Sequence, residues 1–150
     1  MSSQNSSGRN ESASRPSPSE IRPLVPSITP VPLVRYVGSW IFPASNGTFQ
    51  GAEPESVELS VTEEGGHATG AFLGRFKLPT GTTGDPALRL HFAGDFKSTL
   101  NQTFALETSD GATGTIELVP GSAFNLLEVT IRTVPKPGKI NQASMVLVKK

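Results

Sequence analysis

The chain has 150 residues, and its 13 Lys and Arg residues balance 13 Asp and Glu residues, so its formal net charge at pH 7 is zero. Nucleic-acid binding normally requires a basic face, so we expect no nucleic-acid partner. The chain contains no cysteine, which excludes a disulfide framework, a thiolate nucleophile and a cysteine-ligated metal site. A chain of this length accommodates one domain with residues to spare.

The distribution of apolar residues along the chain indicates where in the cell the protein is located. No apolar run approaches the roughly 18 residues that a membrane helix needs, so we expect no membrane association. The N-terminus has no basic region followed by an apolar stretch, so it does not read as a secretory signal. With Met1 taken as the native start, we predict a soluble cytoplasmic protein.

The N-terminal part differs in composition from the rest of the chain. Residues 1–20 are Ser, Asn, Arg, Pro and Glu with almost no apolar side chain, which predicts a disordered tail. Residues 21–32 interleave prolines with aliphatic residues such as Leu24, Val25 and Ile28, and proline restricts both itself and the preceding residue to extended conformations. We expect a polyproline-II arm. Two interpretations of residues 21–32 remain: a stiff linker, or an arm that docks on this domain or on a partner.

The folded domain is predicted to span residues 33–150. Its first segment, residues 33–42, is rich in β-branched and aromatic residues and is predicted to form a strand. Tyr36 and Trp40 would then share one face of that strand. Trp40 reads either as a core residue that closes one end of the sheet or as a platform on which a ligand stacks. Residues 44–54 are expected to form a polar loop.

The clearest structural signal is a long β-hairpin over residues 57–78. Its first half alternates apolar and polar residues, the period of a half-buried strand. The glycine pair at 65–66 supplies a turn, because glycine accepts a positive φ. The return strand is predicted to point Ala71 and Leu73 outward. Its inward residues alternate glycine with large rings, which predicts a strongly curved strand; these residues are Gly70, Phe72, Gly74 and Phe76.

Further alternating segments with turn residues between them follow the hairpin. They are 87–96, 103–107, 113–119, 127–131 and 144–148. We therefore predict an all-β fold, an antiparallel meander of about eight strands that forms a small barrel or sandwich, preceded by the Pro-rich arm. The last segment is apolar on both faces and would be a hazardous open edge, which favours closure.

Two resemblances follow from short motifs. Gly38-Ser39-Trp40 at the start of a strand, together with the acidic-Gly-Gly hairpin and the terminal Val-Leu-Val-Lys, resembles the avidin and lipocalin-like small β-barrels. This resemblance implies a barrel with a tryptophan packed across one end. The chain has one Trp and no Cys, so it departs from the avidin ligand set and from lipocalin disulfides.

The second resemblance is carried by the segments 58–63, 70–79 and 90–94. They are similar to a bacterial all-β accessory domain of unassigned function that occurs as a module of larger proteins. This resemblance implies an accessory or interaction role and supplies no chemistry.

Residues suited to catalysis or metal binding are sparse and dispersed. His67 lies beside the predicted hairpin turn and His91 on the polar face of a strand, and both are expected to be solvated. Two dispersed histidines make a poor metal site. Glu63 and Glu64 read as turn residues rather than as a catalytic carboxylate pair. We predict no catalytic, cofactor-binding or metal-binding residue.

A binding role remains as the leading expectation. We predict a non-catalytic protein-interaction or assembly module that acts through its arm and through Ala71 and Leu73 on the outer sheet face, with a protein partner or self-association. Outward Val119 and Val146 would extend this apolar patch. The alternative is a small-molecule-binding barrel with a small apolar ligand at the open end of the barrel near Tyr36 and Trp40. The large inward rings favour a filled interior over a roomy one.

Overall fold

A computed structural model describes residues 31–43, 47–81 and 83–150. The predicted tail, and all but the last two residues of the predicted arm, lie outside the described residues. None of the described segments forms a helix with the length and apolar character needed to cross a membrane. The elements found in the described part are a 3-10 turn, η1 (Leu33–Arg35), and the strands β3 (Gly38–Ile41), β4 (Phe49–Gly51), β5 (Glu53–Glu64), β6 (His67–Lys77), β7 (Ala87–Asp95), β8 (Gln102–Thr108), β9 (Thr113–Pro120), β10 (Leu126–Thr133) and β11 (Gln142–Lys149).

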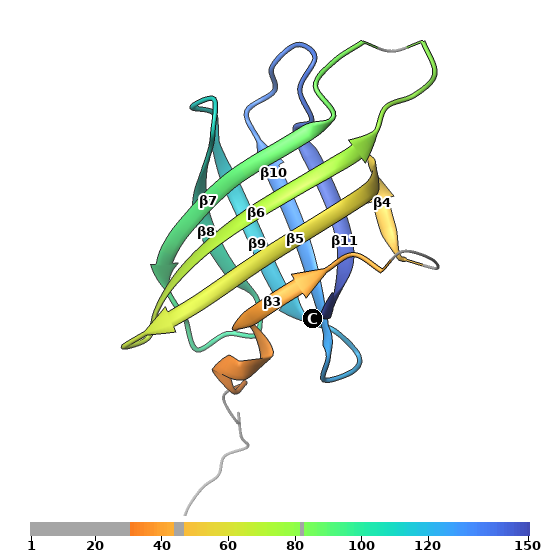
Figure 1. Cartoon of the computed structure of the whole chain (residues 1–150). Coiled ribbons are helices and arrows are strands. Elements are labelled where there is room, and N and C mark those ends of the chain that lie inside the picture. Colours follow the sequence, from red (N-terminus) through yellow and green to blue (C-terminus); the bar gives the residue numbers. More distant parts are fainter. Residues whose placement is uncertain (1–30, 44–46, 82) are drawn as a thin grey trace, which may run out of the picture. The chain divides into compact units, whose positions relative to one another are not determined.

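The strands form a closed antiparallel barrel (Figure 1). Going round the wall, β3 pairs with β5, the strands from β5 to β11 pair in chain order, and β11 returns to β3. Closure is made where Val148 pairs with Ile41 and Lys149 with Trp40. The short strand β4 pairs with the other end of β11. The predicted all-β fold is therefore confirmed in its barrel form, and the apolar terminal strand has neighbours on both sides.

The first predicted strand, residues 33–42, is wrong over its first half. Residues 33–35 form η1, in which the Tyr36 N–H donates to the Leu33 carbonyl at 2.9 Å. The chain then turns at Gly38, whose φ of 131° lies in a region that favours glycine. The Trp40 Nε1–H donates to the Tyr36 carbonyl at 2.9 Å. β-Propensity over 33–37 is thus overridden by the burial of both aromatic side chains at the barrel end.

The predicted loop over residues 44–54 is also shorter than expected. Strand β4 forms within it, and β5 begins at Glu53 rather than near Val57. Pro54 is accommodated because the pairing of β5 with β6 shifts register between Pro54 and Ser56. Proline within a sheet is found at such irregularities, where its missing N–H costs no ladder bond.

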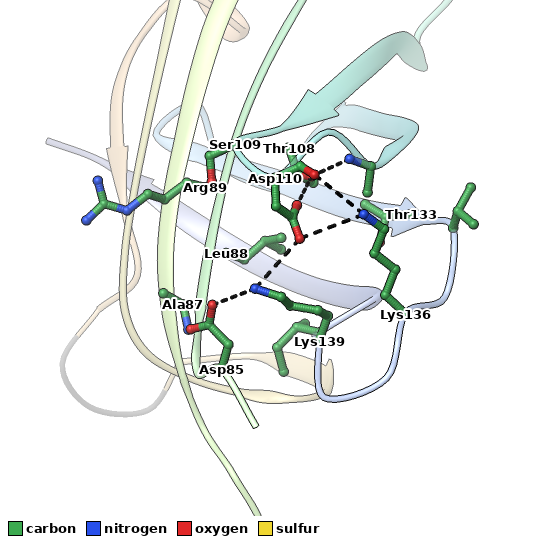
Figure 2. A pocket seen from close by; sticks show the side chains of 13 residues that line it. Asp85, Ala87, Leu88, Arg89, Thr108, Ser109, Asp110, Thr133, Lys136 and Lys139 are labelled. Carbon is green, nitrogen blue, oxygen red and sulfur yellow. Dashed lines mark hydrogen bonds and ion pairs between the residues drawn. The ribbon is translucent and has the colours of Figure 1, made fainter. Parts of the chain in front are cut away.

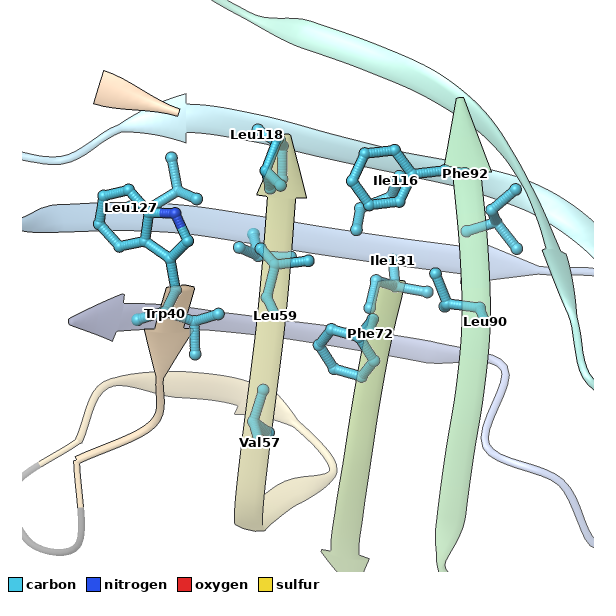
Figure 3. Close-up of a cluster of buried hydrophobic side chains, with 14 of the residues drawn as sticks. Trp40, Val57, Leu59, Phe72, Leu90, Phe92, Ile116, Leu118, Leu127 and Ile131 are labelled. Atoms are coloured by element: carbon cyan, nitrogen blue, oxygen red, sulfur yellow. The ribbon is translucent and has the colours of Figure 1, made fainter. Parts of the chain in front are cut away.

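Side chains that point into the barrel form one hydrophobic core (Figure 3). Burial alternates along β6 as the sequence predicts, so that Ala71 and Leu73 face outward. The rings of Phe92 and Phe104 stack with their centroids 5.3 Å apart. The core fills the barrel with side chains of Tyr36, Trp40, Leu59, Phe72, Phe76, Leu90, Phe92, Phe104, Ile116, Leu118, Leu127, Ile131 and Leu147, among others.

The element η1 packs against one end of the barrel, at the bottom of Figure 1. The Tyr36 hydroxyl donates to the Leu100 carbonyl at 2.6 Å. The Arg35 guanidinium donates to the carbonyls of Gly121 and Ala123 at 3.0 and 3.2 Å. These bonds tie the chain entry to the β7–β8 and β9–β10 loops. At the opposite end lie the loops β6–β7, β8–β9 and β10–β11, and we call this end the mouth.

Two inward glycines on β6 make room for the rings of the core. A Cβ built at Gly70 would run into the Phe92 ring, and one built at Gly74 would lie 2.7 Å from Phe72 Cε1 and 2.8 Å from Phe76 Cε1. The predicted alternation of glycine with large rings therefore has a packing reason: each glycine gives up side-chain volume to a neighbouring ring.

This packing predicts that Gly70→Ala destabilises the protein, because the Phe92 ring must leave its position. We expect the free energy of unfolding in urea to fall by about 1–3 kcal/mol, as for other overpacked cores. Thr69→Val, on the outer face of the same strand, keeps a β-branched side chain; it is the control and should change this free energy by less than about 0.5 kcal/mol. A Gly70→Ala variant as stable as the unmodified chain would contradict the packing described.

Candidate functional site

The outer face of β5, β6 and β7 carries a row of three different side chains. In register, Glu58 of β5 pairs with Leu73 of β6, and Leu73 pairs with Arg89 of β7. Leu73 is 45% exposed, which is high for a large aliphatic residue on a strand. The row therefore places an exposed apolar side chain between an acidic and a basic one.

A shallow hollow lies beside this row on the same face. It has a volume of about 460 Å³, and the outward side chains that line it are Glu58, Ser60, Ala71, Leu73 and Arg89. Ser60 pairs with Ala71 in register, and both side chains are small, so they leave space next to the longer Leu73. We call this group of five residues the outer-face site.

Of the two charged residues in the outer-face site, Glu58 has an ion-pair partner and Arg89 has none among the described residues. The Glu58 carboxylate accepts from Lys150 Nζ at 3.1 Å, and both side chains are more than half exposed. Arg89 has no ion-pair partner among the described residues. A half-exposed carboxylate retains lone pairs for a second donor, so the row can pair with charges outside the chain.

The predicted extension of this patch by Val119 and Val146 is wrong. Both residues pair with Glu128 of β10, one from β9 and the other from β11. Strand β9 is the third strand from β6 in one direction round the barrel, and β11 is the third in the other direction. The apolar part of the outer-face site is therefore confined to Leu73 and Ala71.

A second hollow, of about 140 Å³, lies at the mouth of the barrel (Figure 2). Lys139 Nζ lies 2.8 Å from an Asp85 oxygen and 3.6 Å from an Asp110 oxygen, and Lys136 Nζ lies 4.0 Å from Asp110. These four side chains, which we call the mouth clasp, join all three loops of this end. The Asp85 N–H also donates to the Gly138 carbonyl at 2.8 Å, which fixes two of the loops to each other.

The interactions of the mouth clasp shift the pKa values of Asp85, Asp110 and Lys139. The hydrogen bond from Lys139 lowers the pKa of Asp85, and the hydrogen bond from the Thr108 hydroxyl, helped by the two lysines, lowers that of Asp110. The same interaction with Asp85 raises the pKa of Lys139. All three groups are therefore held in their charged forms around neutral pH.

The aromatic residues predicted as ligand contacts lie in the core. Tyr36 and Trp40 have no exposed surface, and burial is the main cause that raises the pKa of the Tyr36 hydroxyl. Lys149 Nζ lies 5.2 Å from the centroid of the Trp40 ring. Neither ring faces solvent in this structure. Three further predicted contacts, Leu24, Val25 and Ile28, lie outside the described residues.

The histidines lie apart on the barrel exterior. His67 Nδ1 is 2.9 Å from an Asp95 oxygen, and His91 Nε2 is 3.9 Å from a Glu107 oxygen, with both histidines more than half exposed. Neither lines the mouth hollow or the outer-face site. In the described part of the chain, no group of three or more His, Asp or Glu side chains is arranged to hold a metal ion.

Two features escaped the sequence reasoning. Buried Gln102 accepts from the Lys97 N–H at 2.8 Å and donates to the carbonyls of Lys97 and Thr99 at 2.9 and 2.7 Å, which holds the β7–β8 loop. The mouth clasp joins side chains as far apart in sequence as Asp85 and Lys139. One indication of the mouth clasp was present in the sequence: charged residues are concentrated in the turns that lie at this end of the barrel.

The fold is a small closed antiparallel β-barrel with a filled interior, one hollow at its mouth and one on its outer wall. The chain was compared with protein-family models, with curated proteins and with solved structures, and none of them matches it. The geometry of the chain itself is therefore the basis for the function proposed for it.

The mouth clasp makes a prediction about pH. Because the folded-state pKa values of Asp85 and Asp110 are lowered, their stabilising effect is present above the usual Asp pKa and is lost as the pH falls through the lowered values. Lys139 has a raised pKa, so its effect is present below the usual Lys pKa and is lost as the pH rises through the raised value. We expect the clasp to hold at neutral pH and to open at both extremes.

Carboxyl carbon NMR titration measures this directly. Asp85 should titrate below the usual Asp range, and Lys139→Met should move its midpoint up, with a smaller change at Asp110, whose main partner is Thr108. Asp95 is the internal control, because His67 lowers its pKa. An Asp85 midpoint that Lys139→Met leaves unchanged would disprove the assigned pairing.

Proposed function

We propose that this chain is a non-catalytic protein-interaction module that binds a protein partner through the outer-face site, with its N-terminal arm contributing to the contact. The observation that carries the proposal is Leu73, which is 45% exposed and lies beside a hollow among the polar and small outward side chains of β5, β6 and β7. A partner surface usually combines exposed apolar area with a rim of polar and charged groups, and Leu73 with Ala71, Glu58 and Arg89 has this composition.

The packing of the interior supports a surface role. Phe72, Phe76, Phe92 and Phe104 occupy the inside of the barrel. Pockets for small ligands commonly measure about 300–1,000 Å³. The mouth hollow has about 140 Å³, which is below that range, and the hollow of about 460 Å³ lies on the outside of the wall and not in the interior.

The arrangement of reactive groups supports the absence of catalysis in this proposal. Hydroxyl nucleophiles need a base within hydrogen-bond reach. The hydroxyls of Thr108 and Ser109 line the mouth hollow, but the pKa of the adjacent Asp110 is lowered and that of Lys139 is raised, so neither group is a suitable general base near neutral pH. The Thr108 hydroxyl is instead bonded to Asp110 and to the Ala112 N–H, as in a turn.

The proposed contribution of the N-terminal arm to partner binding is based on the sequence of the arm. Proline-rich segments lose little entropy when they bind, since their extended form already exists in the free state. Leu24, Val25 and Ile28 are apolar residues between such prolines and would supply the contacts.

Site-specific photocross-linking tests this proposal in the organism from which the sequence comes. A photoreactive amino acid at position 73 should give a covalent adduct of defined mass with one protein, identified by mass spectrometry of the linked peptides. The matched control places the same group at Glu128, an exposed residue on β10. Removal of residues 1–30 should lower the yield at position 73.

The result that contradicts the proposal is equally definite. If positions 73 and 128 give the same adducts, or if neither gives any, the outer-face site is not a partner surface. A loss of the adduct in a variant that has unfolded is recognised by its circular dichroism, and such a variant is not counted.

A second candidate is binding of a small polar ligand at the mouth, favoured by the hollow that the mouth clasp borders. Lys136 and Lys139 offer ammonium groups there, and Leu88 and Ile140 offer apolar walls. Native mass spectrometry of the purified chain should then show a retained small molecule that is lost in Lys139→Met. A purified chain that carries no bound molecule at all would count against this candidate.

A further inference from the structure

The charge pattern of the outer-face site is complementary to itself. Glu58, Leu73 and Arg89 lie in one row across three strands, with the carboxylate on one side of the leucine and the guanidinium on the other. Neighbouring strands lie about 4.8 Å apart, so the two charges flank Leu73 at nearly equal distances. A row of this kind fits a second row that runs in the opposite direction.

We propose that the protein partner is a second copy of this chain, in a two-fold symmetric dimer whose axis runs along β6 through Leu73. This inference rests on the proposed function of the outer-face site, and it identifies the protein that binds there. The axis exchanges the β5 side with the β7 side. It therefore places Leu73 against Leu73 of the other copy and sets Glu58 opposite Arg89 twice, as an isologous interface requires.

The charges select this axis over the alternative. A two-fold axis that ran across the strands would place Glu58 opposite Glu58 and Arg89 opposite Arg89 of the other copy. Like charges brought together at an interface cost free energy, whereas opposite charges steer association and fix its register. Of the two axes through Leu73, the one along β6 pairs unlike charges.

The shape of the outer-face site suits two leucines. Ala71 and Ser60 are small, and the hollow of about 460 Å³ beside Leu73 lies above them. In the dimer, the two Leu73 side chains meet at the axis, and each can lean toward the small Ala71, which lies opposite Ala71 of the other copy. Ser60 then lies opposite His91 of the other copy. Arg89, which has no ion-pair partner among the described residues, gains one in Glu58 of the other copy.

Positive charges on the outer face of β6 oppose the dimer; Arg75 is the one nearest to Leu73, and Lys77 lies beyond it. Arg75 follows Leu73 by two residues on the same outer face, so the axis along β6 places it near Arg75 of the other copy. The dimer is therefore expected to strengthen when this charge is removed. The stability of the single chain should change little, because Arg75 is exposed and adds only a minor contribution to the low pKa of Asp85.

The curvature of the wall limits the size of the contact. Strands tilt about 35–45° from the axis of a barrel of this kind, so two barrels with aligned β6 strands cross rather than lie side by side. Contact is then confined to the rows next to Leu73. An interface of this extent falls below about 1,200 Å², in the class of weak complexes.

Sedimentation velocity of the full chain tests the proposal. At about 500 μM and low salt, the unmodified chain should show a monomer–dimer equilibrium of the kind a small interface gives. Glu58→Arg and Arg89→Glu should each sediment as monomers, because each sets like charges together at both contacts. An equimolar mixture of the two variants should associate again, since one variant is then basic at both positions of the row and the other is acidic at both. Arg75→Gln should tighten the dimer.

Control variants make the same charge changes on β10, at Glu128→Arg and Arg132→Glu, and should leave the dimer unchanged. The proposal is overturned if the unmodified chain is a monomer at this concentration, if the single variants still dimerise, or if the mixture fails to associate. The proposed function is judged separately: an adduct at position 73 with a different protein, together with a monomeric chain, would retain the interaction role and reject the second copy.

Discussion

Closure of β11 onto β3 is the constraint on which the rest of the structure depends. An eight-stranded barrel encloses a fixed space, and side chains must fill it to the density of a protein interior. In this chain the filling comes from large rings, and Gly70 and Gly74 give them room. Closure also gives the apolar terminal strand β11 partners on both sides, where an open edge would invite aggregation.

Because the barrel is closed and its interior is filled, a partner can bind only at the two ends or on the outer wall. The end at η1 is packed around Tyr36 and Trp40, and the opposite end is bordered by the mouth clasp. On β5, β6 and β7 the other outward side chains are polar or small, so the exposed Leu73 differs from its neighbours on these strands. An interaction role for the outer-face site follows from this exclusion together with the charges of Glu58 and Arg89.

The sequence predicted those features that depend on local alternation. The inward and outward faces of β6 were correct residue by residue, because a period of two needs no knowledge of neighbouring strands. The strand over residues 33–37 was wrong, since burial of Tyr36 and Trp40 at the barrel end decided the local conformation. The Glu58–Leu73–Arg89 row and the mouth clasp could not be predicted, because they depend on which strands and loops lie side by side. The same lack of register information led to the wrong placement of Val119 and Val146 in one patch with Leu73.

The central claim is that the interior is closed and filled, so that binding takes place on the outside. Trp40 is the only tryptophan in the chain, and its fluorescence therefore reports on the barrel interior alone. Iodide quenching of this fluorescence is the most direct measurement. The account predicts that iodide leaves the folded chain almost unquenched and strongly quenches the chain unfolded in guanidinium. Equal quenching of the folded and unfolded chains would show that the end of the barrel is open to solvent and would contradict the account.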